Sequence, residues 1–387
     1  MASMRSSTPP RTSPMRRALG VVAGGLWLLL VPSAVSAEIL DRQNARAFAE
    51  ALLRDRTSLV RWIDQNDIAS SRRLGIEYEE VDLKALIAYD VADTLKRLAE
   101  SGPVAYELAI DTLDDENALL TLTFPIIGAT NRYYFRGLRC VSAIRYLTRH
   151  WSLRESAYLR FHFPADTLTS DYCVARLDAF VERMADVLGL TSDDLVLLRQ
   201  QKIDYYLCQN EEEVERLTGF RARGLAVLAY DALVTTYPTH YHELVHLLLN
   251  YRLRRLPLYT HPFFQEGFAV AYGGRGGIAP DVLVPVGGFL LQSHLVELSD
   301  LLDKEAFARM DASLSYPAAA VMNRYLVATE GIGPYLHRYR QQSGAPEDSA
   351  VRRIRTADTV IRSSLQAAIE LGLGGRTVVP ESTERGG

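Results

Sequence analysis

The chain has 387 residues, of which 48% are hydrophobic and 23% are charged, and its glycine and proline contents are ordinary. This composition excludes a disordered, collagen-like or low-complexity protein, and the length allows two domains with separate cores. A formal net charge of −4 gives no indication of nucleic acid or of an acidic membrane surface as a partner.

Residues 1–37 have the pattern of a secretory signal peptide. Arg16 and Arg17 precede an apolar stretch of fourteen residues at 18–31, and the small residues at 35–37 suit a signal peptidase. The stretch is shorter than the ~20 residues of a membrane-spanning helix, so we expect cleavage, with an uncleaved anchor as the alternative. The segment holds four arginines and no acidic residue, so its removal changes the net charge from −4 to −8. We therefore expect a soluble periplasmic or secreted protein with no stable membrane span.

Residues 38–150 are expected to form a small α+β domain of unknown role. Helical spacing of apolar residues predicts helices over 42–62 and 82–100. Strand-like runs and one hairpin turn follow, with the strands at 104–110, 118–124 and 132–140 and the turn at Asp114–Asn117. No motif in this part indicates a chemical role.

From residue 151 the pattern changes to a few strands followed by helices, which predicts an α+β domain over 151–345 with a small mixed sheet. Strands are expected at 158–163, 203–207 and 225–230. Helices are expected at 172–188 (ended by Gly189), 211–217, 239–252, 262–272, 286–302, 317–328 and 335–339. The helix at 239–252 is apolar over most of its circumference, which predicts a buried helix. Residues 346–387 are expected to form a C-terminal helix at 357–371 and a loose tail after Gly374.

The three cysteines, Cys140, Cys173 and Cys208, are 33 and 35 residues apart, which is not a metal-binding spacing. In an oxidising compartment one pair could form a disulfide, or all three could remain buried thiols. The sequence leaves both alternatives open.

The buried helix contains the motif His-Glu-Leu-Val-His at 242–246. Histidines at i and i+4 lie on one face of a helix with Cβ atoms about 6 Å apart, so both imidazoles can reach one metal ion. Glu243 follows the first histidine and can take a proton from water that the metal acidifies. Burying two unpartnered histidines in an apolar helix is unfavourable, which favours metal binding over two structural histidines.

A third ligand is expected from the next helix. Glu266 lies in the aromatic run at 263–269, which predicts burial, and a buried carboxylate needs a partner or a metal. The alternative explanation is a glutamate stabilised near a helix start by the helix dipole. His261 could replace Glu266 as third ligand, since nitrogen and oxygen ligands both suit zinc.

The sequence H-E-L-V-H, a spacer of nineteen residues and E-G-F-A resemble the gluzincin clan of zinc metallopeptidases, which includes thermolysin and the zinc aminopeptidases. The resemblance covers roughly residues 155–340. It implies a thermolysin-like catalytic domain, with one zinc ion held by His242, His246 and Glu266 and with Glu243 as general base and acid. It also implies hydrolysis of a peptide or protein substrate, in the cell envelope or outside the cell, with the strand at 225–230 pairing with extended substrate.

The chain departs from the clan in two places. It lacks the G-x-M-E-N motif with which aminopeptidases hold a free α-amine, and Val270 stands where thermolysin-like enzymes have a carboxylate that orients a histidine. We therefore expect other groups, such as Asn250 or Asp231, to support the ligands. Endopeptidase and exopeptidase activity both remain open.

Tyr316 is the candidate for stabilising the oxyanion, because the clan uses a tyrosine or histidine for this role and Tyr316 follows Glu266 at a suitable distance. A packing role is the alternative in a chain with twenty tyrosines. The glycine-rich segment 273–277 lacks the lysine of a phosphate-binding loop, which indicates a turn at the edge of the cleft. Arg275 in this turn could pair with a substrate carboxylate.

Two other classes of protein are compatible with the sequence. One is a zinc-binding envelope protein that serves as a binding partner or scaffold without catalysis. The other is a metal-free interaction protein in which the H-E-x-x-H motif occurs by chance. Metal content and peptide cleavage separate the three classes.

Overall fold

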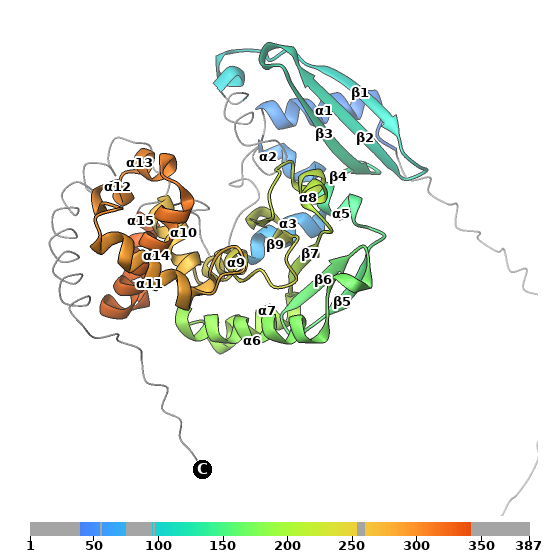
Figure 1. The fold of residues 1–387 in the computed structure, drawn as a ribbon. Coiled ribbons are helices and arrows are strands. Elements are labelled where there is room, and N and C mark those ends of the chain that lie inside the picture. Colours follow the sequence, from blue (N-terminus) through green and yellow to red (C-terminus); the bar gives the residue numbers. More distant parts are fainter. Residues whose placement is uncertain (1–38, 55, 75–94, 96, 254–259, 342–387) are drawn as a thin grey trace, which may run out of the picture. The chain divides into compact units, whose positions relative to one another are not determined.

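The computed structural model describes residues 39–54, 56–74, 95, 97–253 and 260–341 (Figure 1). The fold is α+β, with two small sheets and a helical C-terminal part. Several predicted segments lie outside the described residues: the signal peptide at 1–37, most of the helix at 82–100, the C-terminal helix at 357–371 and the tail after Gly374.

The first sheet is antiparallel, with four strands in the order β1-β2-β3-β4. Alternate residues of β2 are buried because successive side chains of a strand point to opposite faces. The predicted hairpin turn is confirmed, since Asp114 Oδ1 accepts the backbone N–H groups of Glu116 and Asn117. The elements are β1 (Glu107–Thr112), β2 (Asn117–Phe124), η3 (Pro125–Ile127), β3 (Ala129–Arg136) and β4 (Arg139–Val141).

Short helices precede this sheet. The region 42–62, predicted as one helix, is α-helical over its described residues up to Leu59 and ends in a 3-10 turn. Phe48 of the first segment packs on the sheet, with its ring centroid 5.2 Å from that of Tyr133 and 5.0 Å from that of Phe135. The segments are α1 (Arg42–Arg54), α2 (Arg56–Leu59), η1 (Val60–Trp62) and then α3 (Gln65–Arg73).

The second sheet is mixed and has the strand order β5-β6-β7-β9-β8. Its strands are β5 (Ser152–Glu155), β6 (Leu159–Phe163), β7 (Ile203–Leu207), β8 (Gly224–Val227) and β9 (Ala232–Thr235). β6, β7 and β9 are parallel neighbours, and β8 runs antiparallel to β9 at the edge. The strand predicted over 225–230 is thus an edge strand, but it ends at Val227 and continues as η5 (Leu228–Tyr230).

Helices connect the strands of the second sheet. Gly189 ends α6 in the left-handed conformation, at φ 63°, as the sequence predicted. The acidic helix predicted over 211–217 is also present. The connecting elements are α5 (Ala143–Leu147), η4 (Asp166–Leu168), α6 (Asp171–Leu188), α7 (Ser192–Gln201) and α8 (Glu211–Thr218).

The C-terminal part is helical. Its helices are α9 (Tyr241–Leu253), α10 (Pro262–Gly273), α11 (Pro280–Gln292), α12 (Leu298–Leu302), α13 (Lys304–Arg309), α14 (Ala312–Glu330) and α15 (Ile332–Gln341). The single helix predicted over 286–302 is wrong, because the chain leaves the helix after α11 and His294 has φ 53°. The start predicted at Pro317 is also wrong, because Asp311 caps α14 by accepting the backbone N–H of Ser313.

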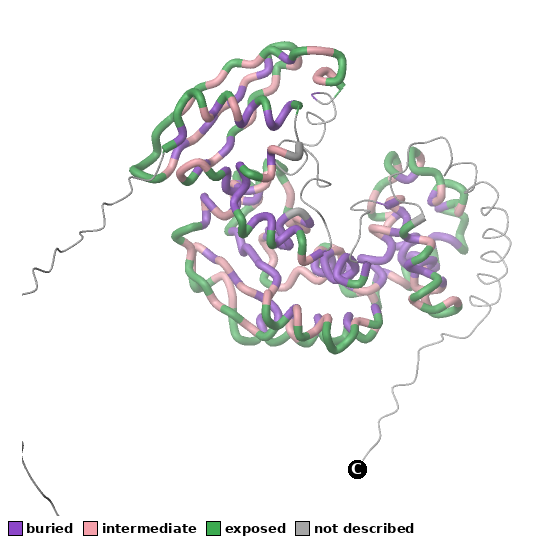
Figure 2. The backbone as a smooth tube through the Cα atoms, turned by 180° about the vertical axis from the view of Figure 1, so that it is seen from behind, coloured by how far each residue is buried: buried purple, intermediate pink, exposed green. Residues whose placement is uncertain are grey.

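The predicted burial of α9 is confirmed, and Figure 2 shows most of this helix as buried. It packs against α6, α10 and the strands β8 and β9. α10 in turn approaches α14 closely at Gly267, where a Cβ atom would lie 2.9 Å from Ala319 Cβ and 2.2 Å from Asn323 Nδ2. α10 is therefore held between α9 and α14.

Cys140, Cys173 and Cys208 are free thiols in the structure, and the first and last are buried. Burial raises the pKa of Cys208 to about 12. In the part of the chain that the structure describes, no helix combines the length and apolar character needed to cross a membrane.

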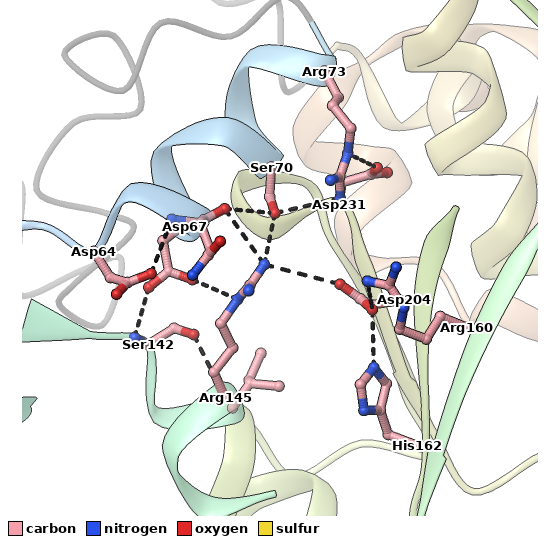
Figure 3. Close-up of polar contacts among 12 residues, drawn as sticks. Asp64, Asp67, Ser70, Arg73, Ser142, Arg145, Arg160, His162, Asp204 and Asp231 are labelled. Atoms are coloured by element: carbon pink, nitrogen blue, oxygen red, sulfur yellow. Dashed lines mark hydrogen bonds and ion pairs between the residues drawn. The ribbon is translucent and has the colours of Figure 1, made fainter. Parts of the chain in front are cut away.

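A network of buried charges joins α3 to the second sheet (Figure 3). Asp67 Oδ1 lies 2.8 Å from Arg145 Nε, and the same guanidinium is 3.9 Å from Asp204 of β7. Arg73 Nε donates to Asp231 Oδ2 at 2.8 Å, immediately before β9. Burial raises the pKa of Asp67 to about 6 and that of Asp231 to about 7, because the charged form of each is removed from water.

Candidate metal centre

Helix α9 holds the two histidines of the H-E-x-x-H motif one turn apart. The ring centroids of His242 and His246 are 5.0 Å apart, and the two ring planes are nearly perpendicular. The side chains are only 9% and 11% exposed. The regular helix geometry therefore brings both imidazoles to one buried point, as the motif predicted.

Glu266 of α10 lies at the same point. Its Oε2 is 3.2 Å from His242 Nε2, and its Oε1 is 3.9 Å from His246 Nε2. One ligand atom from each of the three residues lies within 4.8 Å of the others, an arrangement that could hold a metal ion. Burial favours the neutral form of Glu266, but its contacts with the two histidines outweigh burial and lower the pKa of its carboxyl.

The backbone around the site orients the first histidine. His242 Nδ1 is 2.9 Å from the carbonyl oxygen of Gly274, and a proton on Nδ1 donated to this oxygen leaves Nε2 free as a ligand. Asn250 and Asp231, which the sequence suggested as supports for the ligands, have other partners. Asn250 donates to the backbone carbonyl of His246, and Asp231 accepts hydrogen bonds from Arg73 and Tyr251. The supporting group was missed because a backbone carbonyl leaves no signal in the sequence beyond the glycine-rich turn.

Glu243 links the motif helix to the edge strand. Its Oε2 accepts the backbone N–H of Ala226 in β8 at 3.0 Å. Burial raises the pKa of Glu243 to about 7, and the negative charge of Glu266 acts in the same direction. The carboxyl group therefore lies between the candidate metal-binding cluster and β8, the edge strand of the sheet as described.

The other histidines of this region lie outside the cluster. His261 caps α10, where its Nδ1 accepts the backbone N–H of Phe263 at 3.1 Å. His261, the alternative third ligand, is not part of the cluster, so the structure favours Glu266. His240 Nδ1 is 2.7 Å from Thr235 Oγ1, and burial together with the neighbouring histidines lowers its pKa to about 3.

Tyr316 projects from α14 into the same cleft. Its ring centroid is 5.9 Å from that of Phe307, and Arg275 Cζ lies over the ring, 4.8 Å from its centroid. Burial and the charge of Glu266 raise the pKa of Tyr316 to about 12, so its hydroxyl is a hydrogen-bond donor at neutral pH.

These groups open into a cleft of about 1250 Å³. Strand β8, the motif helix α9 and helices α10, α11 and α14 all contribute to its lining. A cleft of this size accommodates several residues of an extended peptide, and the edge strand β8 offers backbone groups for pairing in addition to the Ala226 N–H that Glu243 accepts.

Comparison of the chain with protein-family models, with curated proteins and with solved structures found no match. The case for a function therefore rests on the geometry of the site. Within the described residues, His242, His246 and Glu266 are the one set of at least three His, Cys, Asp or Glu side chains with a metal-binding arrangement.

Proposed function

We propose that this protein is an exported zinc metallopeptidase of the gluzincin type, acting in the periplasm or outside the cell. The observation that carries the proposal is the cluster of His242, His246 and Glu266 with Glu243 beside it in an open cleft. Two imidazole nitrogens and one carboxylate are a ligand set of catalytic zinc, which leaves a coordination position open. The Gly274 carbonyl supports this fit, since it directs His242 Nε2 toward the cluster.

A zinc ion held by these three residues would supply a Lewis acid that acidifies water and polarises the carbonyl of the substrate. Glu243 takes the proton of the attacking water and then returns it to the leaving amine. Tyr316 donates a hydrogen bond to the oxygen of the carbonyl as negative charge develops on it. β8 orients the peptide by backbone pairing, as other sheet edges do.

We expect the purified protein to cleave members of a peptide library at neutral pH, with products identified by mass spectrometry. Removal of metal by a chelator should abolish cleavage, because the water is then no longer activated. One equivalent of zinc should restore it. Stoichiometric zinc without cleavage of any peptide would instead support the zinc-binding scaffold, and cleavage that survives complete removal of metal would contradict the mechanism.

A further inference from the structure

Arg275 is a cation in the cleft whose charge lowers the pKa of the Glu266 and Asp311 carboxyl groups without forming a direct ion pair with either. It lines the cleft and is partly buried, and its Cζ lies 4.8 Å from the ring centroid of Tyr316. Across the ranges that the structure describes, no carboxylate forms an ion pair with it within 4.0 Å. A partly desolvated guanidinium is a strong donor for a planar, bidentate acceptor such as a carboxylate.

The turn that carries Arg275 is tied to the metal-binding cluster. Arg275 and Ile278 exchange two backbone hydrogen bonds, of 3.0 and 2.9 Å. Gly274 has φ 76°, and a Cβ atom on it would lie 2.2 Å from the carbonyl oxygen of Ile278, so only glycine fits there. The carbonyl of the same Gly274 contacts His242. The turn therefore fixes the backbone of Arg275 next to His242, and the guanidinium lies against the ring of Tyr316.

The other charged groups that line the cleft are already engaged. Arg223 is paired with Glu211 at 3.1 Å and donates to the hydroxyl of Tyr237 at 3.2 Å. Glu243 accepts from the backbone of β8, and Glu266 contacts both histidines. Among the described lining residues, Arg275 is the charged group left for an incoming ligand.

The wall next to Arg275 is apolar. Ile278, Val282 and Val286 line the cleft and are 48%, 56% and 42% exposed. The two valines lie one turn apart on α11 and so share one face of that helix, and Ile278 lines the same cleft. Phe220 also lines the cleft and is 49% exposed. This surface suits apolar side chains on the ligand that carries the carboxylate.

We propose that Arg275 binds a carboxylate of an otherwise apolar peptide substrate, close to the bond that is cut. The inference rests on the proposed peptidase function and specifies the substrate class of that site. Two sources offer this chemistry: the free C-terminal carboxylate of the peptide, and an Asp or Glu side chain. The first source makes the enzyme act near C termini, and the second makes it cut beside internal acidic residues.

The test uses three blocked peptides of alanine and leucine. One ends in a free carboxylate, the second is amidated, and the third is amidated and carries one internal glutamate. The wild-type enzyme should cleave the free acid or the glutamate peptide with a kcat/KM about tenfold or more above that of the plain amide. Whichever of the two is preferred identifies the source. Equal kcat/KM for all three would overturn the proposal and leave the peptidase function in place.

Two substitutions locate the preference. Arg275→Met, which keeps the packing on Tyr316, should remove the preference for the carboxylate-bearing peptide over the plain amide. Arg275→Lys should retain part of this preference. Arg223→Met is the matched control, because this arginine lines the same cleft but is already paired, and it should leave the preference unchanged. A preference that survives in Arg275→Met, or that is lost in Arg223→Met alone, would overturn the assignment.

A binding measurement separates this inference from the proposed function. Fluorescence anisotropy with labelled versions of the three peptides and zinc-loaded Glu243→Gln protein needs no turnover. A Kd about tenfold or more lower for the free acid or the glutamate peptide than for the plain amide would support the carboxylate site even if no peptide were cleaved. Adding Arg275→Met should abolish this difference. Equal Kd values would contradict it even if cleavage were efficient.

Discussion

Replacing Glu243 by glutamine is expected to lower kcat for peptide hydrolysis by about 10²–10⁴-fold and to leave the metal content unchanged. The amide oxygen can still accept the backbone N–H of Ala226, so the position of α9 against β8 should be preserved. The amide cannot take a proton from water, and none of the three ligands is altered. The measurement is kcat on a peptide from the library, together with the zinc content of the same sample.

Glu305→Gln is the matched control for this substitution. Glu305 lies on α13, is 84% exposed and pairs with Arg309 one turn away, so kcat should stay at the wild-type value. Full hydrolysis by Glu243→Gln would remove the general base from the mechanism. Loss of zinc from this variant would show that Glu243 acts as a ligand.

The second large effect is expected for stability. Arg73→Met should lower the free energy of unfolding at pH 8 by about 1–3 kcal/mol, because the buried carboxyl group loses its cation and hydrogen bond and must take up a proton to stay buried. Asp231 is completely buried and accepts hydrogen bonds on Oδ2 from Arg73 and from the hydroxyl of Tyr251, which belongs to the motif helix. Removing Arg73 should therefore also destabilise α9 and the turn beside β8.

The effect of Arg73→Met should be smaller at pH 5.5. Burial raises the native pKa of Asp231 to about 7, whereas the unfolded value is near 3.9. An acid with a raised native pKa takes up a proton on folding between these values, so its contribution to stability falls as pH rises through this window. Removing Arg73 should raise the native pKa of Asp231 further. The stability of the variant should therefore continue to fall at pH values above the window in which the wild-type protein loses stability.

Denaturant unfolding at pH 5.5 and pH 8 measures both effects. Arg309→Met is the control, since that arginine is 73% exposed and its ion pair with Glu305 should contribute little. A loss for Arg73→Met at pH 8 no larger than that of the control would refute the role of the buried pair. An equal loss at the two pH values would refute the ionisation of Asp231 as its cause.

The cluster of His242, His246 and Glu266 was largely predictable because the spacing of its two histidines is local. The spacing of His242 and His246 in a helix fixes their common face, and α9 has the expected geometry. Glu266 was predictable because a carboxylate in an apolar run needs a buried partner. The metal itself and its chemistry stay predictions.

The parts that the sequence did not predict depend on tertiary contacts. The Gly274 carbonyl that orients His242 is a backbone group, which residue types cannot reveal. Arg73 and Asp231 are 158 positions apart, and their pairing follows only from the packing of α3 on η5. Strand β9 has four residues, too few for a periodic signal, and it is positioned by parallel pairing with β7.

The central claim is a catalytic zinc ion on α9 and α10, and metal analysis by mass spectrometry tests it most directly. We expect about one zinc per chain in the wild-type protein and in His294→Ala, whose histidine is 76% exposed and remote from the cluster in sequence. His246→Ala should lose the metal and all peptide cleavage, because only two ligands remain. Absence of stoichiometric zinc from the wild type, or its full retention in His246→Ala, would contradict the account.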